Sequence, residues 1–265
     1  MKIETVQTDR FSMKYFRFGS GEGTMVILPG LSVQSVMDFA PAVAAAYRPL
    51  ADAFSIYVFD RRADLPAACS VHDMARDTAE ALRALGLRDV CLFGASQGGM
   101  IALVLAVEHP DLVKKLALGS TAARVTASQY RVIETWVRLA EQRDRTGLYL
   151  AFGQAVYPPA MFEQAKAALT AAALTVTDEE LTRFITLAKG AKSFDVTAEL
   201  SGVRCPVLVL GAADDGVLGP DAASDLIARL KDRPDFSFHL YDGYGHAAYD
   251  TAPDYRDRLL RFFAP

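Results

Sequence analysis

Short apolar runs alternate with stretches whose apolar residues recur every three or four positions along most of the chain. Such runs are typical of strands buried on both faces of a sheet, and the longer spacing is typical of helices. The predicted strands cover residues 2–8, 12–18, 24–28, 55–60, 90–93, 115–119 and 236–242, with another inside 206–215. The predicted helices cover residues 41–52, 71–87, 97–109, 220–230 and 253–263.

This alternation stops after Ser120, and residues 121–198 show helical patterns with frequent aromatic residues but no convincing strand. Strands that alternate with helices predict a mostly parallel sheet covered by helices on both faces. We therefore expect an α/β core made of residues 1–120 and 199–265, with residues 121–198 inserted as a helical cap.

Composition narrows the class of protein. The 265 residues suffice for one large α/β domain, and the net charge of −4 gives no basic excess for binding nucleic acid. No apolar run resembles a signal peptide or a membrane span, so we expect a cytoplasmic protein without a membrane partner. The three cysteines are too few and too widely spaced to indicate a disulfide framework or a zinc site.

The segment Gly94-Ala95-Ser96-Gln97-Gly98 joins a predicted strand to a predicted helix. A serine at the apex of such a turn is exposed, and small residues two positions away on each side avoid clashes. The backbone N–H of Gln97 opens a helix N-terminus, where negative charge is favoured. The motif alone is weak, but in this context it predicts the nucleophile elbow of a serine enzyme, with Ser96 as nucleophile.

A nucleophilic serine needs a base, and His246 is the best candidate among the four histidines. It lies in a Gly-rich loop after the last predicted strand, whereas His72, His109 and His239 lie in predicted helices or a strand. The acid that orients the imidazole would come from Asp214 or Asp215, which follow another apolar strand.

The chain resembles the α/β-hydrolase superfamily over nearly its whole length. The resemblance rests on "VILPGLS", "FGASQGG", "VLVLGAADDGVLGP" and "GYGHAAYD". It implies an eight-stranded sheet, a helical cap and the order Ser96, Asp214, His246, because Asp214 has the family's spacing from Gly211. It also implies that the backbone N–H of Leu31 joins that of Gln97 in an oxyanion hole.

Two positions depart from the family pattern. Pro29 stands where the family usually has histidine, although Gly30 is retained. Asp60 is followed by "RRADLP" in place of a Gly-rich loop, so Arg61 or Arg62 is either a surface charge or a group at the rim of the pocket.

These observations predict a serine hydrolase that cleaves an ester, lactone or related acyl bond of a small molecule through an acyl-enzyme. Candidate substrate contacts are Trp136, Tyr157 and Val217, with packing inside the cap as the alternative for the aromatic residues. No metal site or organic cofactor is expected, and a homodimer is left open. The alternatives are other chemistry at the same site (C–C bond hydrolysis, a lyase or a perhydrolase) and a non-catalytic ligand-binding protein.

Overall fold

The computed structural model describes residues 1–264, and these contain one sheet of eight strands. The strands are β1 (Ile3–Gln7), β2 (Ser12–Phe18), β3 (Gly23–Leu28), β4 (Phe54–Arg62), β5 (Val90–Ala95), β6 (Val113–Gly119), β7 (Val207–Ala212) and β8 (Phe236–Tyr241). Their spatial order is β1-β2-β4-β3-β5-β6-β7-β8. Only the β1–β2 and β2–β4 pairs are antiparallel, which confirms the predicted, mostly parallel sheet.

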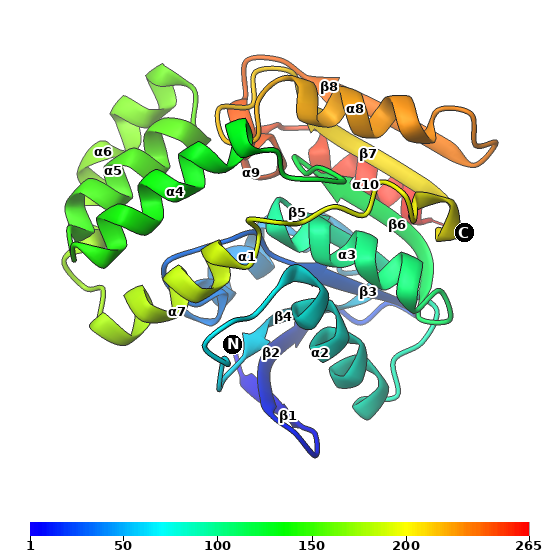
Figure 1. Cartoon of the computed structure of the whole chain (residues 1–265). Coiled ribbons are helices and arrows are strands. Elements are labelled where there is room, and N and C mark those ends of the chain that lie inside the picture. The colour runs from blue at the N-terminus through cyan, green and yellow to red at the C-terminus, as the bar shows by residue number, and fades with distance from the viewer. Residues whose placement is uncertain (265) are drawn as a thin grey trace.

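Helices cover both faces of this sheet (Figure 1). One face packs against α2 (Val71–Ala84), α3 (Gln97–Glu108) and α8 (Asp221–Leu230). The other face packs against α1 (Ala40–Ala46) and α10 (Tyr255–Phe263), and the short α9 (Ala248–Thr251) precedes α10. Strands β5 and β7 are buried throughout, as the continuous apolar runs predict for strands covered on both sides.

The helix predicted over residues 41–52 is broken into two pieces, α1 and a 3-10 turn, and another 3-10 turn precedes them. A 3-10 turn (Val36–Phe39) leads into α1, and a second 3-10 turn (Arg48–Leu50) follows it. Pro49 lies in the second turn, and a proline lacks the N–H that an α-helix needs and clashes with the preceding turn. The apolar spacing therefore located the helical segment but not its interruption.

Four helices occupy the chain between β6 and β7: α4 (Ala127–Glu141), α5 (Arg145–Val156), α6 (Pro159–Ala173) and α7 (Asp178–Lys189). We call this group the helical insertion; Figure 1 shows it gathered on one side of the sheet in green and yellow-green. Its entry and exit segments are paired, because Arg124 and Asp195 form an antiparallel bridge. Within residues 1–264, no helix has the length and apolar character needed to cross a lipid bilayer.

The parallel sheet decides where the predicted functional residues meet. Strands β5, β7 and β8 run in the same direction, so the loops that follow them open at one edge of the sheet. This edge, at the carboxyl ends of the strands, is the usual place for a binding site in an open α/β sheet. Ser96, Asp214, Asp215 and His246 all follow these three strands in the chain.

Candidate active site

Ser96 occupies a sharp turn between β5 and α3. Its φ of 52° lies in the left-handed region, which non-glycine residues rarely adopt and which is common at functional sites. The flanking glycines make the turn sterically feasible: a Cβ on Gly94 would lie 2.3 Å from the Gly98 carbonyl oxygen. A Cβ on Gly98 would lie 2.0 Å from the carbonyl oxygen of Leu28. The two glycines thus allow the strand, the turn and β3 to approach closely.

His246 links Ser96 to a carboxylate. The histidine lies in a short 3-10 turn (Gly245–Ala247) after β8, and its ring is almost fully buried. Its Nε2 lies 2.9 Å from the Ser96 Oγ, and its Nδ1 lies 2.8 Å from Oδ2 of Asp215. A nucleophile in contact with a base, and a base in contact with an orienting acid, is the arrangement that activates a serine hydroxyl.

The carboxylate beside His246 belongs to Asp215, so the expectation that Asp214 would lie there is wrong. Asp215 is buried, and its Oδ1 accepts hydrogen bonds from the N–H groups of Val217 and Leu218 at 2.8 and 2.9 Å. Asp214 is exposed and accepts the N–H of Gly245 at 3.0 and 3.1 Å. Asp214 therefore supports the loop that carries His246 without touching the imidazole.

The reason why Asp215, and not Asp214, contacts His246 lies at the end of β7. Pairing with β8 continues one residue beyond the strand, since the N–H of Ala213 donates to the carbonyl of Tyr241 at 2.7 Å. The chain then turns, so that the Asp214 carboxylate meets the N–H of Gly245 and the Asp215 carboxylate meets the ring of His246. Only one of the two neighbouring aspartates therefore contacts the imidazole. Spacing from Gly211 does not decide which one, because Gly211 is required for packing: a Cβ there would lie 2.4 Å from the Cβ of Ala223.

The loop after β3 lies directly against the serine. A Cβ on Gly30 would be 3.1 Å from the Ser96 Cβ and 3.7 Å from its Oγ, so the Gly30 backbone abuts the nucleophile. The N–H of Gln97 is the first of α3 and lacks an acceptor within its helix. Among residues 1–264 the N–H of Leu31 makes no hydrogen bond either. Both predicted oxyanion donors are therefore free to serve a substrate oxygen.

The helical insertion is attached to the site by polar contacts from α7. The side-chain amide of Gln97 donates to the carbonyl oxygen of Leu187 at 2.7 Å, while its own oxygen is buried without a partner in the described residues. The Arg183 guanidinium donates to Oδ1 of Asp60 at 3.1 Å and to the Arg61 carbonyl at 3.0 Å. The turn that carries Ser96 is thus connected to a helix about ninety residues further along the chain.

The two arginines after Asp60 have different surroundings. Arg61 is only 5% exposed, and its guanidinium donates to the Pro29 carbonyl oxygen at 2.7 Å. Burial lowers the pKa of Arg61 to about 10, so the side chain remains charged at neutral pH. Arg62 points away from this loop, towards Asp77 at 3.5 Å and the ring of Phe11. Sequence reasoning named the pair but did not identify the buried member.

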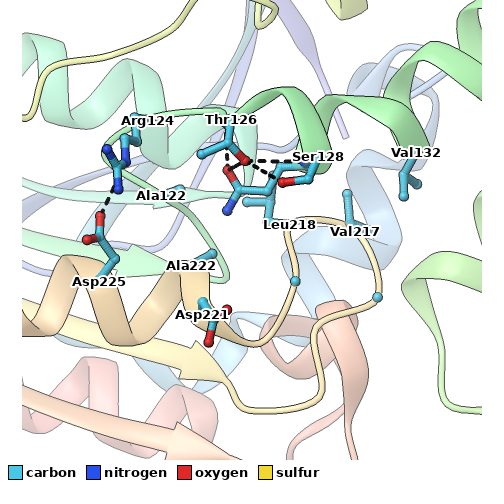
Figure 2. A pocket seen from close by; sticks show the side chains of 13 residues that line it. Ala122, Arg124, Thr126, Ser128, Val132, Val217, Leu218, Asp221, Ala222 and Asp225 are labelled. Atoms are coloured by element: carbon cyan, nitrogen blue, oxygen red, sulfur yellow. Dashed lines mark hydrogen bonds and ion pairs between the residues drawn. The ribbon is translucent and has the colours of Figure 1, made fainter.

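The three candidate substrate contacts lie in different environments. Trp136 is buried within the insertion, with its ring centroid 4.5 Å from that of Phe152, and Tyr157 is half-buried. Val217 lines a cavity of about 440 Å³ between the start of α4 and the β7–α8 loop, shown in Figure 2. Neither Trp136 nor Tyr157 lines that cavity, so the structure does not bring the three side chains together there.

Burial raises the pKa of two tyrosines near His246. The ring of Tyr249 meets that of His246 edge-on at 6.0 Å, and burial raises the pKa of Tyr249 well above its ordinary value. Burial also raises the pKa of Tyr157. Both phenols are therefore uncharged near neutral pH. In the part of the chain that the structure describes, no group of three His, Cys, Asp or Glu side chains is arranged to hold a metal ion.

Solved structures with the same fold cover almost the whole chain. MGS-M2, an alpha/beta hydrolase enzyme from a Medee basin deep-sea metagenome library, has a TM-score of 0.86 at 19% identity, covering 99% of this chain and 98% of its own. The enol-lactonase from Burkholderia xenovorans LB400 has a TM-score of 0.82 at 18% identity, covering 99% of this chain and all of its own. At these identities, the likeness concerns the fold.

Sequence relatives and a family model agree with this fold. The "Putative carbamate hydrolase RutD" of Agrobacterium fabrum is 27% identical over 251 residues, which is 91% of this chain and 93% of that relative. The human "Serine hydrolase BPHL" is 26% identical over 150 residues, 53% of this chain and 50% of its own. The model of the alpha/beta hydrolase fold matches residues 23–253. The chain therefore belongs to the α/β-hydrolase fold family and is a hydrolase-like enzyme.

Proposed function

We propose that the protein is a serine hydrolase that cleaves an acyl bond of a small molecule, with Ser96, His246 and Asp215 as its catalytic triad. The observation that carries this proposal is the continuous contact from the Ser96 Oγ through the His246 ring to Asp215, at 2.9 and 2.8 Å. A lone serine on a tight turn would not suffice, because its hydroxyl is a weak nucleophile without an adjacent base.

The reaction follows from this geometry. His246 takes the proton of Ser96 as the oxygen attacks the substrate carbonyl, and Asp215 stabilises the resulting imidazolium. The N–H groups of Leu31 and Gln97 receive the oxyanion. His246 then returns the proton to the leaving group, and water attacks the acyl-enzyme by the same route to release the acid.

The substrate class is a small ester, lactone or carbamate. Esters and lactones share the electrophilic carbonyl that an activated serine attacks, and carbamates are included because several relatives of 26–29% identity carry names that refer to carbamate hydrolysis. The half-buried position of Ser96 beneath the insertion favours a small molecule over a polymer.

Labelling with a fluorophosphonate probe tests the proposal, because an activated serine attacks the probe's phosphorus, displaces fluoride and becomes phosphonylated. We expect the wild-type protein to be labelled and Ser96→Ala and His246→Ala to remain unlabelled. Turnover of p-nitrophenyl esters, lactones and aryl carbamates then ranks the substrate classes. The proposal fails if folded wild-type protein is not labelled, or if Ser96→Ala retains most of the esterase activity.

A further inference from the structure

Arg61 is a buried cation that makes no salt bridge within residues 1–264, and the nearby Asp60 carboxylate pairs with Arg183 instead. Its neighbour Asp60 is already occupied, since Oδ1 accepts from Arg183 and Oδ2 accepts from the hydroxyl of Ser35 at 2.6 Å. Among residues 1–264, Arg61 makes no salt bridge, and its buried Nε has no acceptor. A charge held away from water is costly unless something compensates it, so this arrangement calls for an explanation.

The one strong side-chain contact of Arg61 is with the loop that abuts the nucleophile. Its guanidinium donates to the carbonyl oxygen of Pro29 at 2.7 Å, the short distance expected of a charge-assisted hydrogen bond. That carbonyl belongs to the peptide that links Pro29 to Gly30, and Gly30 lies against Ser96. The next N–H along the chain after Gly30 is that of Leu31, the second oxyanion donor of the proposed reaction.

The surroundings leave no room for a substrate group on Arg61 itself. The cavity that it lines with Pro29, Gly30, Gln97 and Arg183 has a volume of about 10 Å³. That volume holds about one water molecule. A substrate carboxylate, with three heavy atoms, does not fit there. Arg61 therefore acts through the loop, and not by contact with the reacting molecule.

We propose that Arg61 is a positioning residue for acyl transfer, which fixes the Pro29–Gly30 segment so that the Leu31 N–H faces the developing oxyanion. This inference rests on the proposed function. The charge of the guanidinium acts in the same direction, because positive charge in a site shielded from water stabilises negative charge that develops nearby. Pro29 contributes a fixed φ and Arg61 holds its carbonyl, so the Pro29–Gly30 segment is held in place although neither residue has a side chain that can form a hydrogen bond.

The test compares Arg61→Met and Arg61→Lys with Arg62→Met in steady-state hydrolysis of one neutral and one anionic aryl ester. Arg62→Met is the matched control, because Arg62 has the same chemistry one residue away but contacts Asp77 and Phe11. We expect Arg61→Met to lower kcat by about 10- to 100-fold for both esters with KM changed less than about threefold, somewhat below the loss of a whole oxyanion donor. Arg61→Lys, which keeps the charge, should recover at least part of the loss, and Arg62→Met should stay within about threefold of wild type.

A second measurement separates positioning from folding. A boronic acid inhibitor forms a tetrahedral adduct on the serine, so across wild type, Arg61→Lys and Arg61→Met its affinity should fall in parallel with kcat/KM if the oxyanion loop is displaced. The inference is overturned if folded Arg61→Met keeps kcat within twofold of wild type, if its loss equals that of Arg62→Met, or if the loss appears only as a higher KM for the anionic ester. Failure of the proposed function is a different result, in which the wild type itself shows no Ser96-dependent hydrolysis.

Discussion

Replacing Asp215 with Asn changes a buried carboxylate that makes three hydrogen bonds while preserving its shape. Oδ1 can still accept from the N–H groups of Val217 and Leu218. The group that faces His246 is then an NH₂, which donates to Nδ1 and forces the imidazole into the tautomer that carries its proton on Nε2. In that tautomer the ring cannot accept the proton of Ser96.

The size of the effect follows from the charge that is lost. An imidazolium and a carboxylate whose charge centres are about 4 Å apart attract each other by about 4 kcal/mol at an effective dielectric constant near 20. At about 1.4 kcal/mol for each factor of ten, this alone lowers the rate by about a thousandfold. The wrong tautomer adds to the loss, and the same replacement in a well-known serine protease lowers kcat by about 10⁴. We therefore expect Asp215→Asn to lower kcat/KM by about 10³- to 10⁴-fold.

Asp214→Asn is the matched control, since it makes the same chemical change one residue away. The exposed Asp214 accepts only the N–H of Gly245, and an amide oxygen can replace it, so we expect kcat/KM to stay within about threefold of wild type. The assay is p-nitrophenyl acetate hydrolysis, with circular dichroism to establish folding. If Asp214→Asn shows the thousandfold loss and Asp215→Asn does not, the assignment of the orienting acid is refuted.

Three further changes test the packing that supports the site. Gly98→Ala should destabilise the protein by at least about 1–3 kcal/mol in urea unfolding, because its Cβ would lie 2.0 Å from the backbone oxygen of Leu28. Trp136→Ala should cost about 3–5 kcal/mol in the same measurement, since the ring is buried within the helical insertion. Asp73→Asn should lower stability most near neutral pH, because the Ser70 hydroxyl holds the pKa of Asp73 below the usual 3.8. The carboxylate therefore stabilises the protein at pH values above 3.8, and this stabilisation is lost as the pH falls through the lowered pKa.

Each of these changes has an outcome that would contradict it. Gly202→Ala is the control for the glycine, because its Cβ would meet Val107 at an ordinary 3.4 Å; an equal loss in both variants would exclude a specific backbone clash. A stable Trp136→Ala protein with a raised KM would identify the indole as a substrate contact. A stability difference between wild type and Asp73→Asn that stays constant from pH 7 to pH 2.5 would show that ionisation of the Asp73 carboxylate does not stabilise the protein.

Most of the sheet could be predicted because its strands are short apolar runs. Strand β5 and helix α3 were located to within about two residues, since an apolar run, a glycine pair and helical spacing follow one another without a gap. The proximity of Ser96 and His246 could be predicted for the same reason: each follows a strand whose direction the pattern specifies. The contact between them then depends only on loops at one edge of the sheet.

The remaining parts of the site depend on contacts that spacing does not encode. The choice between Asp214 and Asp215 depends on the turn after β7, where Asp214 meets the N–H of Gly245 and Asp215 meets His246. The surroundings of Arg61 include Arg183, 123 residues beyond Asp60 in the chain, which pairs with the Asp60 carboxylate. Long-range partners of this kind have no signature in a single sequence.

The hydrogen bond from Gln97 to Leu187 connects α7 with the turn that carries the nucleophile, so a movement of one affects the other. If α7 moves outward to admit a substrate, it must release the amide of the residue that also supplies the first oxyanion donor. The side-chain oxygen of Gln97 is already without a hydrogen-bond partner in the described residues. Opening would therefore leave both its oxygen and its NH₂ group without a partner unless water or substrate enters. Losing a buried hydrogen bond of this kind costs about 1–3 kcal/mol. Any outward movement of α7 would therefore have a cost to which the Gln97 side chain contributes, together with the contacts of Arg183.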